Sequence, residues 1–456
     1  MFRRYQSLSF VLFMFLVATG LSTSTWGQDA RPQTTPATES RVPPAKPLFR
    51  DFMGINGHTV NFKPELYRPV ARLVRDYHPI DWDLGDDTAY PVEFPFARNG
   101  VNWESVYGSW KEHGIEIDAC LMFSSIAPDR WKNLQADAER YGSEFAKNFG
   151  PSSKRNLVST VEIGNEPGNY DHDTYIEVFR SMAKGVRKAD PQMKIATCNV
   201  YADEGGDYHK PADRFLGLDE LYDVLSIHSY AMISSWPKWE RSYPEDQRFP
   251  GFIRDIDRLI EWRNNKAPDK EVWLTEFGYD SSTKKPTKDD EFAQWEGSSD
   301  TQQAQWLVRS YFLFATRDLQ RAYIYFFNDE DVPKLHNASG LTRHYQPKPS
   351  YFAVSHLLQT LGDYRFSRVV QRQVDQSCVY EFAHETDPNQ AVWVAWSPTG
   401  VDRKSEVEVD LDSWQIERGE QMPMADETPD TVTVTREGEK VVLPISESPS
   451  YFWLKR

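Results

Sequence analysis

The chain of 456 residues has few cysteines and no excess of positive charge. Cys120 and Cys198 lie in apolar, strand-like runs and are interpreted as small core residues, and Cys378 is the third and last cysteine. The sequence contains no CxxC pair and no Cys/His cluster of the kind that binds a metal, so no cofactor is expected. The net charge of -16 makes nucleic acid and anionic membrane surfaces unfavourable partners.

A transmembrane span is also lacking, because the apolar run at 10–21 is shorter than the roughly 20 residues that a span needs. The run follows a positively charged start and precedes small residues, which predicts a signal peptide over 1–27 and export to the periplasm or the medium. An uncleaved anchor is the alternative. No cysteine follows the run, so a lipoprotein anchor is not expected. The segment 28–47, rich in Pro, Thr and Ala, predicts a disordered linker.

No solenoid repeat is present, and no GxGxxG follows the first predicted strand. Short apolar runs instead alternate with stretches of helical spacing, which is typical of a parallel α/β fold. The predicted strands are 52–56, 71–77, 115–123, 157–164, 194–200, 224–230, 272–277 and 322–328. The clearest helices are 103–113, 131–149, 173–188, 252–264, 301–317 and 351–361. Eight such units over 48–362 predict a (β/α)8 TIM barrel, with an open doubly wound sheet as the alternative.

Past Gly362 the pattern changes to strand-like runs separated by turn-rich gaps. This pattern predicts a small all-β, sandwich-like domain over 363–456. We expect it to pack against the barrel helices; carbohydrate binding is the alternative.

Two carboxylates, Glu166 and Glu276, each end an apolar run. A barrel of this type keeps its catalytic side chains at the carboxyl ends of its strands. Alternation along the fourth predicted strand would place Glu162, Gly164 and Glu166 on the interior face. Two carboxyl groups that face each other across a cleft can cleave a glycosidic bond.

Other polar residues end neighbouring strands. His228 and Tyr230 share a face, and Tyr230 could donate its hydroxyl proton to Glu276 and so keep that carboxylate ionised. Arg75 is expected to point inward and lower the pKa of the nearest carboxyl group. A more apolar setting is expected to keep Glu166 protonated, which would separate the two carboxyl groups into an acid and a nucleophile.

Three short motifs carry a resemblance to a known group. They are Asn165-Glu166-Pro167, His228-x-Tyr230 and the strand-terminal Glu276. With them the chain resembles clan A glycoside hydrolases over roughly 50–360. The phrases VEIGNEPG and WLTEFG look most like family 39, the β-xylosidase and iduronidase branch, with family 5 next.

The resemblance implies a retaining (β/α)8 enzyme that cleaves β-linked sugars. It implies Glu166 as acid/base and Glu276 as nucleophile. It also implies Asn165 at the sugar 2-hydroxyl, Tyr230 at the nucleophile and Arg75 nearby.

The sequence departs from that group at the end of the eighth predicted strand, where many members have Trp. Here Phe327 or Asn328 takes that place. The loop after the sixth predicted strand supplies Trp236 and Trp239, either as a platform for a sugar ring or as a plug on the barrel.

Two other classes stay open. The first is a secreted barrel that binds carbohydrate without cleaving it. The second is a metal-dependent hydrolase, although its potential ligands His58, His78, His113 and His228 are scattered singly. The expected partner is a carbohydrate substrate, with no nucleic acid and no membrane after signal cleavage. Which sugar is cleaved and the oligomeric state are not encoded in these patterns.

Overall fold

A computed structural model describes residues 45–58, 63–204, 206–438 and 440–456. The predicted signal peptide and the predicted linker as far as residue 44 lie outside these ranges. Residues 45–47 of that linker are described, and there the Lys46 ammonium donates to the Thr316 carbonyl oxygen at 3.4 Å. Within the described ranges, no helix is both long enough and apolar enough to cross a membrane.

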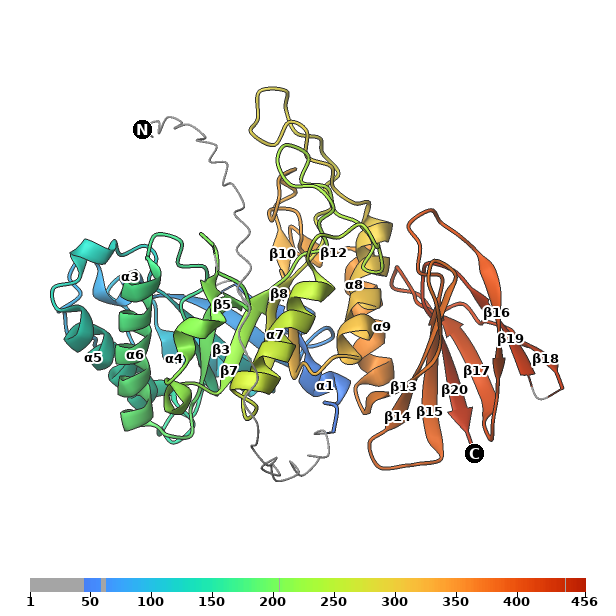
Figure 1. Cartoon of the computed structure of the whole chain (residues 1–456), viewed down its shortest axis with the longest axis horizontal. Coiled ribbons are helices and arrows are strands. Elements are labelled where there is room, and N and C mark those ends of the chain that lie inside the picture. Colours follow the sequence, from blue (N-terminus) through green and yellow to red (C-terminus); the bar gives the residue numbers. More distant parts are fainter. Residues whose placement is uncertain (1–44, 59–62, 205, 439) are drawn as a thin grey trace, which may run out of the picture. The chain divides into compact units, whose positions relative to one another are not determined.

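A closed barrel of eight parallel strands forms the centre of the fold (Figure 1). Its strands are β1 (Met53–Asn56), β2 (Leu73–Pro79), β3 (Glu116–Met122), β4 (Thr160–Ile163), β5 (Lys194–Tyr201), β7 (Val224–His228), β8 (Glu271–Phe277) and β9 (Arg321–Ile324). Each strand pairs in parallel with the next, and β9 pairs with β1, which closes the sheet. The barrel and its eight predicted strands are therefore confirmed, and the open sheet is excluded.

The six predicted helices are also confirmed: α4 (Trp103–Glu112), α5 (Leu134–Phe149), α6 (His172–Ala189), α7 (Ile253–Lys266), α8 (Asp300–Ala315) and α9 (Pro349–Leu361). A side-chain cap marks the start of α4, α5, α6 and α8. Helix α5 begins later than predicted because the Asn133 side chain accepts the Ala136 amide at 3.2 Å. Helix α8 begins with a capping box between Ser299 and Gln302.

Shorter elements complete this part of the chain. The helices are α1 (Phe49–Phe52), α2 (Pro64–Tyr67), α3 (Ile80–Leu84) and the 3-10 turns η1 (Pro128–Arg130), η2 (Ala212–Phe215) and η3 (Asp219–Leu221). The strands are β6 (Lys210–Pro211), β10 (Asn328–Asp329), β11 (Thr342–Arg343) and β12 (Gln346–Pro347).

The C-terminal part consists of two antiparallel sheets. The larger one joins β13 (Tyr364–Gln373), β14 (Ser377–His384), β15 (Gln390–Trp396), β20 (Ser450–Lys455) and β17 (Gln415–Gln421). The smaller one joins β16 (Ser405–Asp410), β19 (Lys440–Ile445) and β18 (Thr435–Glu437). Val379 and Trp393 from the first sheet share a buried core with Val407 and Leu443 from the second. The predicted sandwich is confirmed.

This sandwich packs against the barrel through helix α8. The ring of Phe312 lies 5.3 Å from that of Trp396, centroid to centroid. The Trp396 indole also donates to Glu245, at 2.7 Å, in the loop that follows β7. Buried Arg309 of α8 donates to the same carboxylate at 3.1 Å and to the Thr399 carbonyl oxygen at 2.9 Å. One buried carboxylate thus connects a loop at the barrel mouth with both a barrel helix and the sandwich.

Candidate active site

A cavity of about 490 Å³ opens at the carboxyl ends of the barrel strands. Its wall includes Tyr77, Trp82, Glu166, Glu276, Tyr325 and His336. Both carboxylates singled out in the sequence therefore reach one cavity, at the end of the barrel where this fold keeps its catalytic groups.

Glu276, near the end of β8, has its carboxylate bound from three sides. Its Oε1 accepts from Arg75 at 3.0 Å and from the Tyr77 hydroxyl at 2.7 Å. Its Oε2 accepts from the Tyr230 hydroxyl at 2.8 Å. Burial by itself would raise the pKa of Glu276, but the charges of His228 and Arg75 and the two tyrosine hydroxyls outweigh it and hold that pKa below its usual value. The site keeps Glu276 ionised.

Arg75 is fully buried and points inward from β2. Its guanidinium donates to Glu162 through two nitrogens, at 2.6 and 3.0 Å, as well as to Glu276. It also donates to the Asn165 side-chain oxygen at 2.7 Å. A fourth bond runs to the Asn56 side-chain oxygen on β1, at 2.8 Å. A guanidinium keeps its charge and offers several donors in a fixed fork, so one side chain orients four acceptors, from β1, β4, β8 and the turn after β4.

Glu166 reaches the cavity through a turn and not through strand alternation. Strand β4 ends at Ile163, and Gly164 follows with φ of 85°. A Cβ atom there would lie 3.2 Å from the Phe123 ring and 3.3 Å from the Tyr175 ring. Position 164 therefore requires glycine, because the backbone there is left-handed and a side chain has no space. The turn also ends the strand, so residues 162 to 166 do not form the continuous interior face that alternation predicted.

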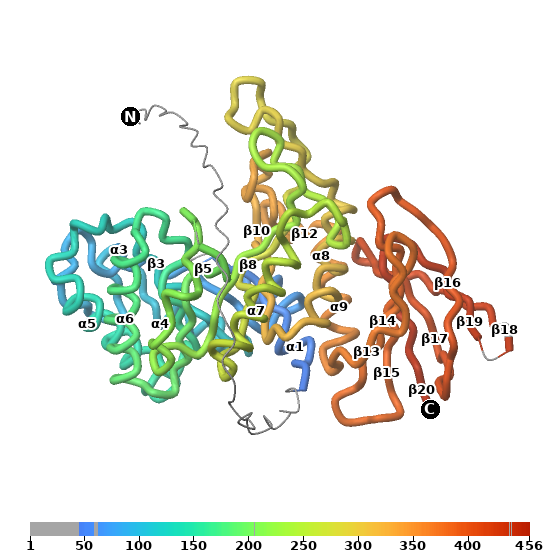
Figure 2. The backbone as a smooth tube through the Cα atoms, in the orientation of Figure 1, coloured from blue at the N-terminus to red at the C-terminus, as the bar shows by residue number. Residues whose placement is uncertain are grey.

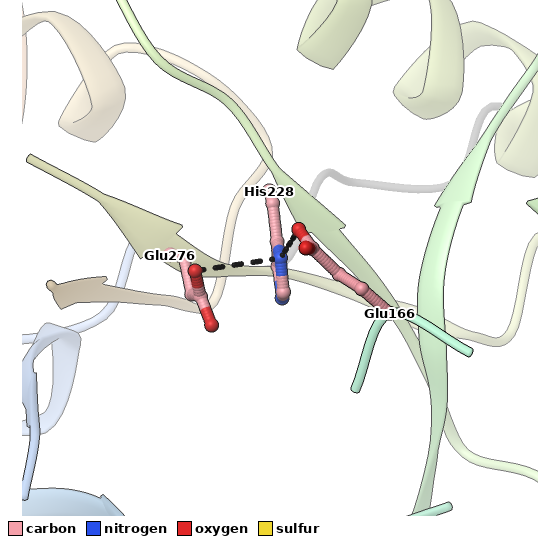
Figure 3. A group of neighbouring side chains, drawn as sticks. All are labelled: Glu166, His228 and Glu276. Carbon is pink, nitrogen blue, oxygen red and sulfur yellow. Dashed lines mark hydrogen bonds and ion pairs between the residues drawn. The ribbon is translucent and has the colours of Figure 1, made fainter. Parts of the chain in front are cut away.

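The carboxyl group of Glu166 lies beside an imidazole (Figure 3). His228 Nδ1 is 2.7 Å from Glu166 Oε1 and 3.6 Å from Glu276 Oε2. Burial opposes the charged imidazole, but Glu276 and Glu166 outweigh it and raise the pKa of His228. The sequence predicted apolar surroundings for Glu166, and this prediction was wrong: the structure places the polar side chain of His228 against its carboxyl group. Carboxylate oxygens of Glu166 and Glu276 lie within 4.8 Å of each other.

The structure does not bring Phe327 and Asn328 to the cavity. Strand β9 ends at Ile324, so alternation does not carry on to these positions. Phe327 is buried and stacks on Tyr67 at 3.7 Å, and the Asn328 amide oxygen accepts from Thr342 at 3.0 Å. Tyr325 takes the expected place at the cavity wall.

The two predicted tryptophans also lie outside this cavity. Trp239 is half-buried, and its ring lies 6.3 Å from that of Phe292 in the loop after β8, which fits the plug interpretation. Trp236 is 69% exposed and lines a neighbouring groove.

The wall also contains residues outside the predicted site set: Tyr77, Pro79, Trp82, Met122, Tyr325 and His336. Tyr77 lies two residues beyond Arg75 on the same strand, so alternation along β2 was a signal for it. Trp82 stacks on buried Trp103 at 6.0 Å, and His336 packs edge-on against Tyr230 at 4.5 Å. His336 lies on a long loop after β9 that has no periodicity, and Tyr325 lies just past the end of that strand.

Glu166, His228 and Glu276 together have the composition of a small metal site. Both oxygens of Glu276 already accept hydrogen bonds, and the adjacent Arg75 is positively charged. An added cation would compete with these donors and be repelled by Arg75, so the arrangement fits acid–base chemistry better than metal binding. The three cysteines are all buried and unpaired.

No family model and no curated protein matches the chain. Several solved structures match the chain in fold. A family 39 glycoside hydrolase from Bacteroides cellulosilyticus matches with a TM-score of 0.65 at 18% identity, over 90% of this chain and 81% of that one. The chain has the barrel fold of clan A glycoside hydrolases. A glucosidase from Croceicoccus marinus matches with a TM-score of 0.63 at 14% identity, over 90% and 97% of the two chains. A family 30 xylanase from Clostridium acetobutylicum matches with a TM-score of 0.56 at 11% identity, over 90% and 98%.

Proposed function

We propose that the protein is a glycoside hydrolase that cleaves β-linked glycosidic bonds in oligo- or polysaccharides with retention of configuration. The supporting observation is the pair of carboxylates at the barrel mouth, within 4.8 Å of each other, one of which is held ionised. Retaining enzymes hold their carboxyl groups about 5–5.5 Å apart and inverting enzymes about 6.5–9.5 Å apart.

In the first step, a carboxylate oxygen of Glu276 attacks the anomeric carbon and the bond to the leaving-group oxygen breaks. That oxygen takes a proton from Glu166. His228 Nδ1 lies 2.7 Å from Glu166 Oε1, so the imidazole is placed to pass a proton to Glu166. Loss of the proton leaves the Glu166 carboxylate beside a neutral His228.

In the second step, the oxygen of a water molecule attacks the anomeric carbon of the glycosyl ester on Glu276 and forms a bond to it. Glu166, now ionised, accepts a proton from that water, and the ester bond to Glu276 breaks. Arg75, Tyr77 and Tyr230 keep their hydrogen bonds to the carboxylate that leaves, so each stabilises the negative charge that returns to Glu276.

The roles are tested with Glu276→Ala and Glu166→Ala on a panel of aryl glycosides. Glu276→Ala is expected to abolish turnover of every substrate. Glu166→Ala is expected to spare dinitrophenyl glycosides, whose leaving group needs no proton, and to regain rate when azide is added. Glu330→Gln, a change at an exposed carboxylate outside the cavity, is the control and should leave the rates unchanged. Equal losses on good and poor leaving groups, without azide rescue, would contradict the assignment.

We also propose that the protein is exported to the periplasm or the medium, on the strength of the N-terminal sequence pattern. Fractionation of producing cells and N-terminal sequencing of the mature protein test this. A mature chain that starts near Gln28 is expected, whereas an intact N-terminus in the cytoplasm would refute it.

A further inference from the structure

A second cavity, a groove of about 640 Å³, lies beside the first. It is formed by the end of β5, the loop after β7 and the start of α7, and it is lined by Tyr201, Ser229, Tyr230, Trp236, Asp255 and Arg258, among others. Tyr230 belongs to the wall of both cavities. The two cavities therefore adjoin at Tyr230.

The groove opens on the side of the proposed acid, Glu166. The Tyr201 hydroxyl in the groove donates to the His228 carbonyl oxygen at 2.6 Å, and the ring of that histidine contacts Glu166. Burial, and after it the negative charges of Asp255, Glu166 and Asp203, raises the pKa of Tyr201. Glu276, in contrast, accepts from Tyr77 of β2 and from Tyr230, and it does not line the groove. Because the acid protonates the leaving-group oxygen, the leaving group extends from Glu166 toward this groove.

Trp236 offers an exposed aromatic surface there. It lies near the tip of a hairpin-like loop whose base is the bridge between Met232 and Arg241. The loop after β8 supports the hairpin, since the Glu296 amide donates to the Lys238 carbonyl oxygen at 3.0 Å; the two loops run together in the tube view (Figure 2). A large ring that is 69% exposed, on a hairpin supported by a second loop, can pack against the C–H face of a sugar.

The charges of the groove favour a neutral ligand. Arg254 and Arg258 line it together with Asp203 and Asp255, so the two signs cancel. Arg254 lies 3.7 Å from Asp255, which neutralises that pair locally. The lining therefore offers donors and acceptors for hydroxyl groups without a net attraction for an anionic substituent.

Building on the proposed glycosidase activity, we infer that this groove binds the leaving-group portion of the substrate, and that this portion is itself a neutral saccharide that stacks on Trp236. The natural substrate is then an oligosaccharide chain and not the glycoside of a small alcohol.

The test compares two substrates that share the same sugar in the catalytic cavity. A panel of aryl glycosides first identifies that sugar. The kcat/KM is then measured for the corresponding glycosyl fluoride, whose leaving group is one atom, and for oligosaccharides of two to five units. In the unchanged protein kcat/KM is expected to rise with chain length. Trp236→Ala should lower kcat/KM for the oligosaccharides by about tenfold, equivalent to about 1.4 kcal/mol, mainly through KM, and leave the fluoride within about twofold.

Two controls make the result specific. Trp236→Phe keeps an aromatic face and should retain most of the gain with chain length. Phe96→Ala removes another exposed ring, 57% exposed, that lines neither cavity, and it should change neither substrate. An equal loss on fluoride and oligosaccharide, or no loss on either, overturns the inference while the glycosidase activity stands. If neither kind of substrate is cleaved by the unchanged protein, the proposed function itself fails.

Discussion

Tyr230→Phe tests whether the hydrogen bonds around Glu276 maintain its charge. The substitution removes one of the two hydroxyl donors and leaves Arg75 and Tyr77 in place. A hydrogen bond to a charged group contributes about 1.5–3 kcal/mol. We therefore expect kcat to fall about 10- to 100-fold, which corresponds to about 1.4–2.7 kcal/mol, with a smaller effect on substrate binding.

The pH profile gives the more specific signature. The pKa of Glu276 is held below its usual value, so the ionised form persists as the pH falls, and activity is lost only when that lowered pKa is reached. Removing a donor to the charged form raises the pKa. The acidic limb of kcat/KM against pH, which reports the free enzyme, should therefore move to higher pH in Tyr230→Phe.

Two further tyrosines serve as comparisons. Tyr77→Phe, which removes the donor to the other oxygen of Glu276, should shift the limb in the same direction. Tyr170→Phe removes a buried hydroxyl that donates to the Ile126 carbonyl oxygen at 2.6 Å, away from Glu276, and should lower stability without a shift of the limb. A folded Tyr230→Phe protein with an unchanged acidic limb would refute the idea that this hydroxyl keeps Glu276 ionised.

Three more predictions follow from the same geometry. NMR of the first-formed product should show the anomer of the substrate, and an inverted anomer would rule out Glu276 as the nucleophile. Arg75→Met should lower the free energy of unfolding by about 3–5 kcal/mol in a urea titration, because it leaves Glu162 and Glu276 buried without their cation; a loss below about 1 kcal/mol would show that the barrel tolerates the unpaired charges. Dialysis against a chelator should leave the hydrolysis rate unchanged, and a loss that one divalent ion restores would reopen the metal-dependent alternative.

The sequence predicted the barrel well because strand and helix runs are governed by local periodicity. The cavity at the barrel mouth was only partly predictable. Glu276 lies near the end of its strand, so the apolar run located it. Glu166 also follows its strand, but its orientation depends on the turn at Gly164, and its partner His228 comes from a strand distant in sequence. His336 enters from a loop whose path is set by tertiary contacts, which leave no pattern in the sequence.

Phe327 and Asn328 illustrate the limit of strand alternation. The rule predicts which side chains point inward only while the backbone stays extended and paired. Strand β9 stops at Ile324, and the chain then turns so that Phe327 packs under Tyr67. Errors of this kind concentrate at the ends of strands. The catalytic side chains of (β/α)8 barrels lie at the same ends.

The buried carboxylate of Glu245 has a consequence for how this protein can diversify. Glu245 belongs to the same loop as Trp236, yet its hydrogen-bond donors are Trp396 in the sandwich and Arg309 in a barrel helix. Substitutions within the C-terminal sheets can therefore affect the position of the loop beside the groove without any change in the groove's own residues. Under the proposed function, selection for a different chain length of saccharide can act on a position such as Trp396, 151 residues away from Glu245 in this loop.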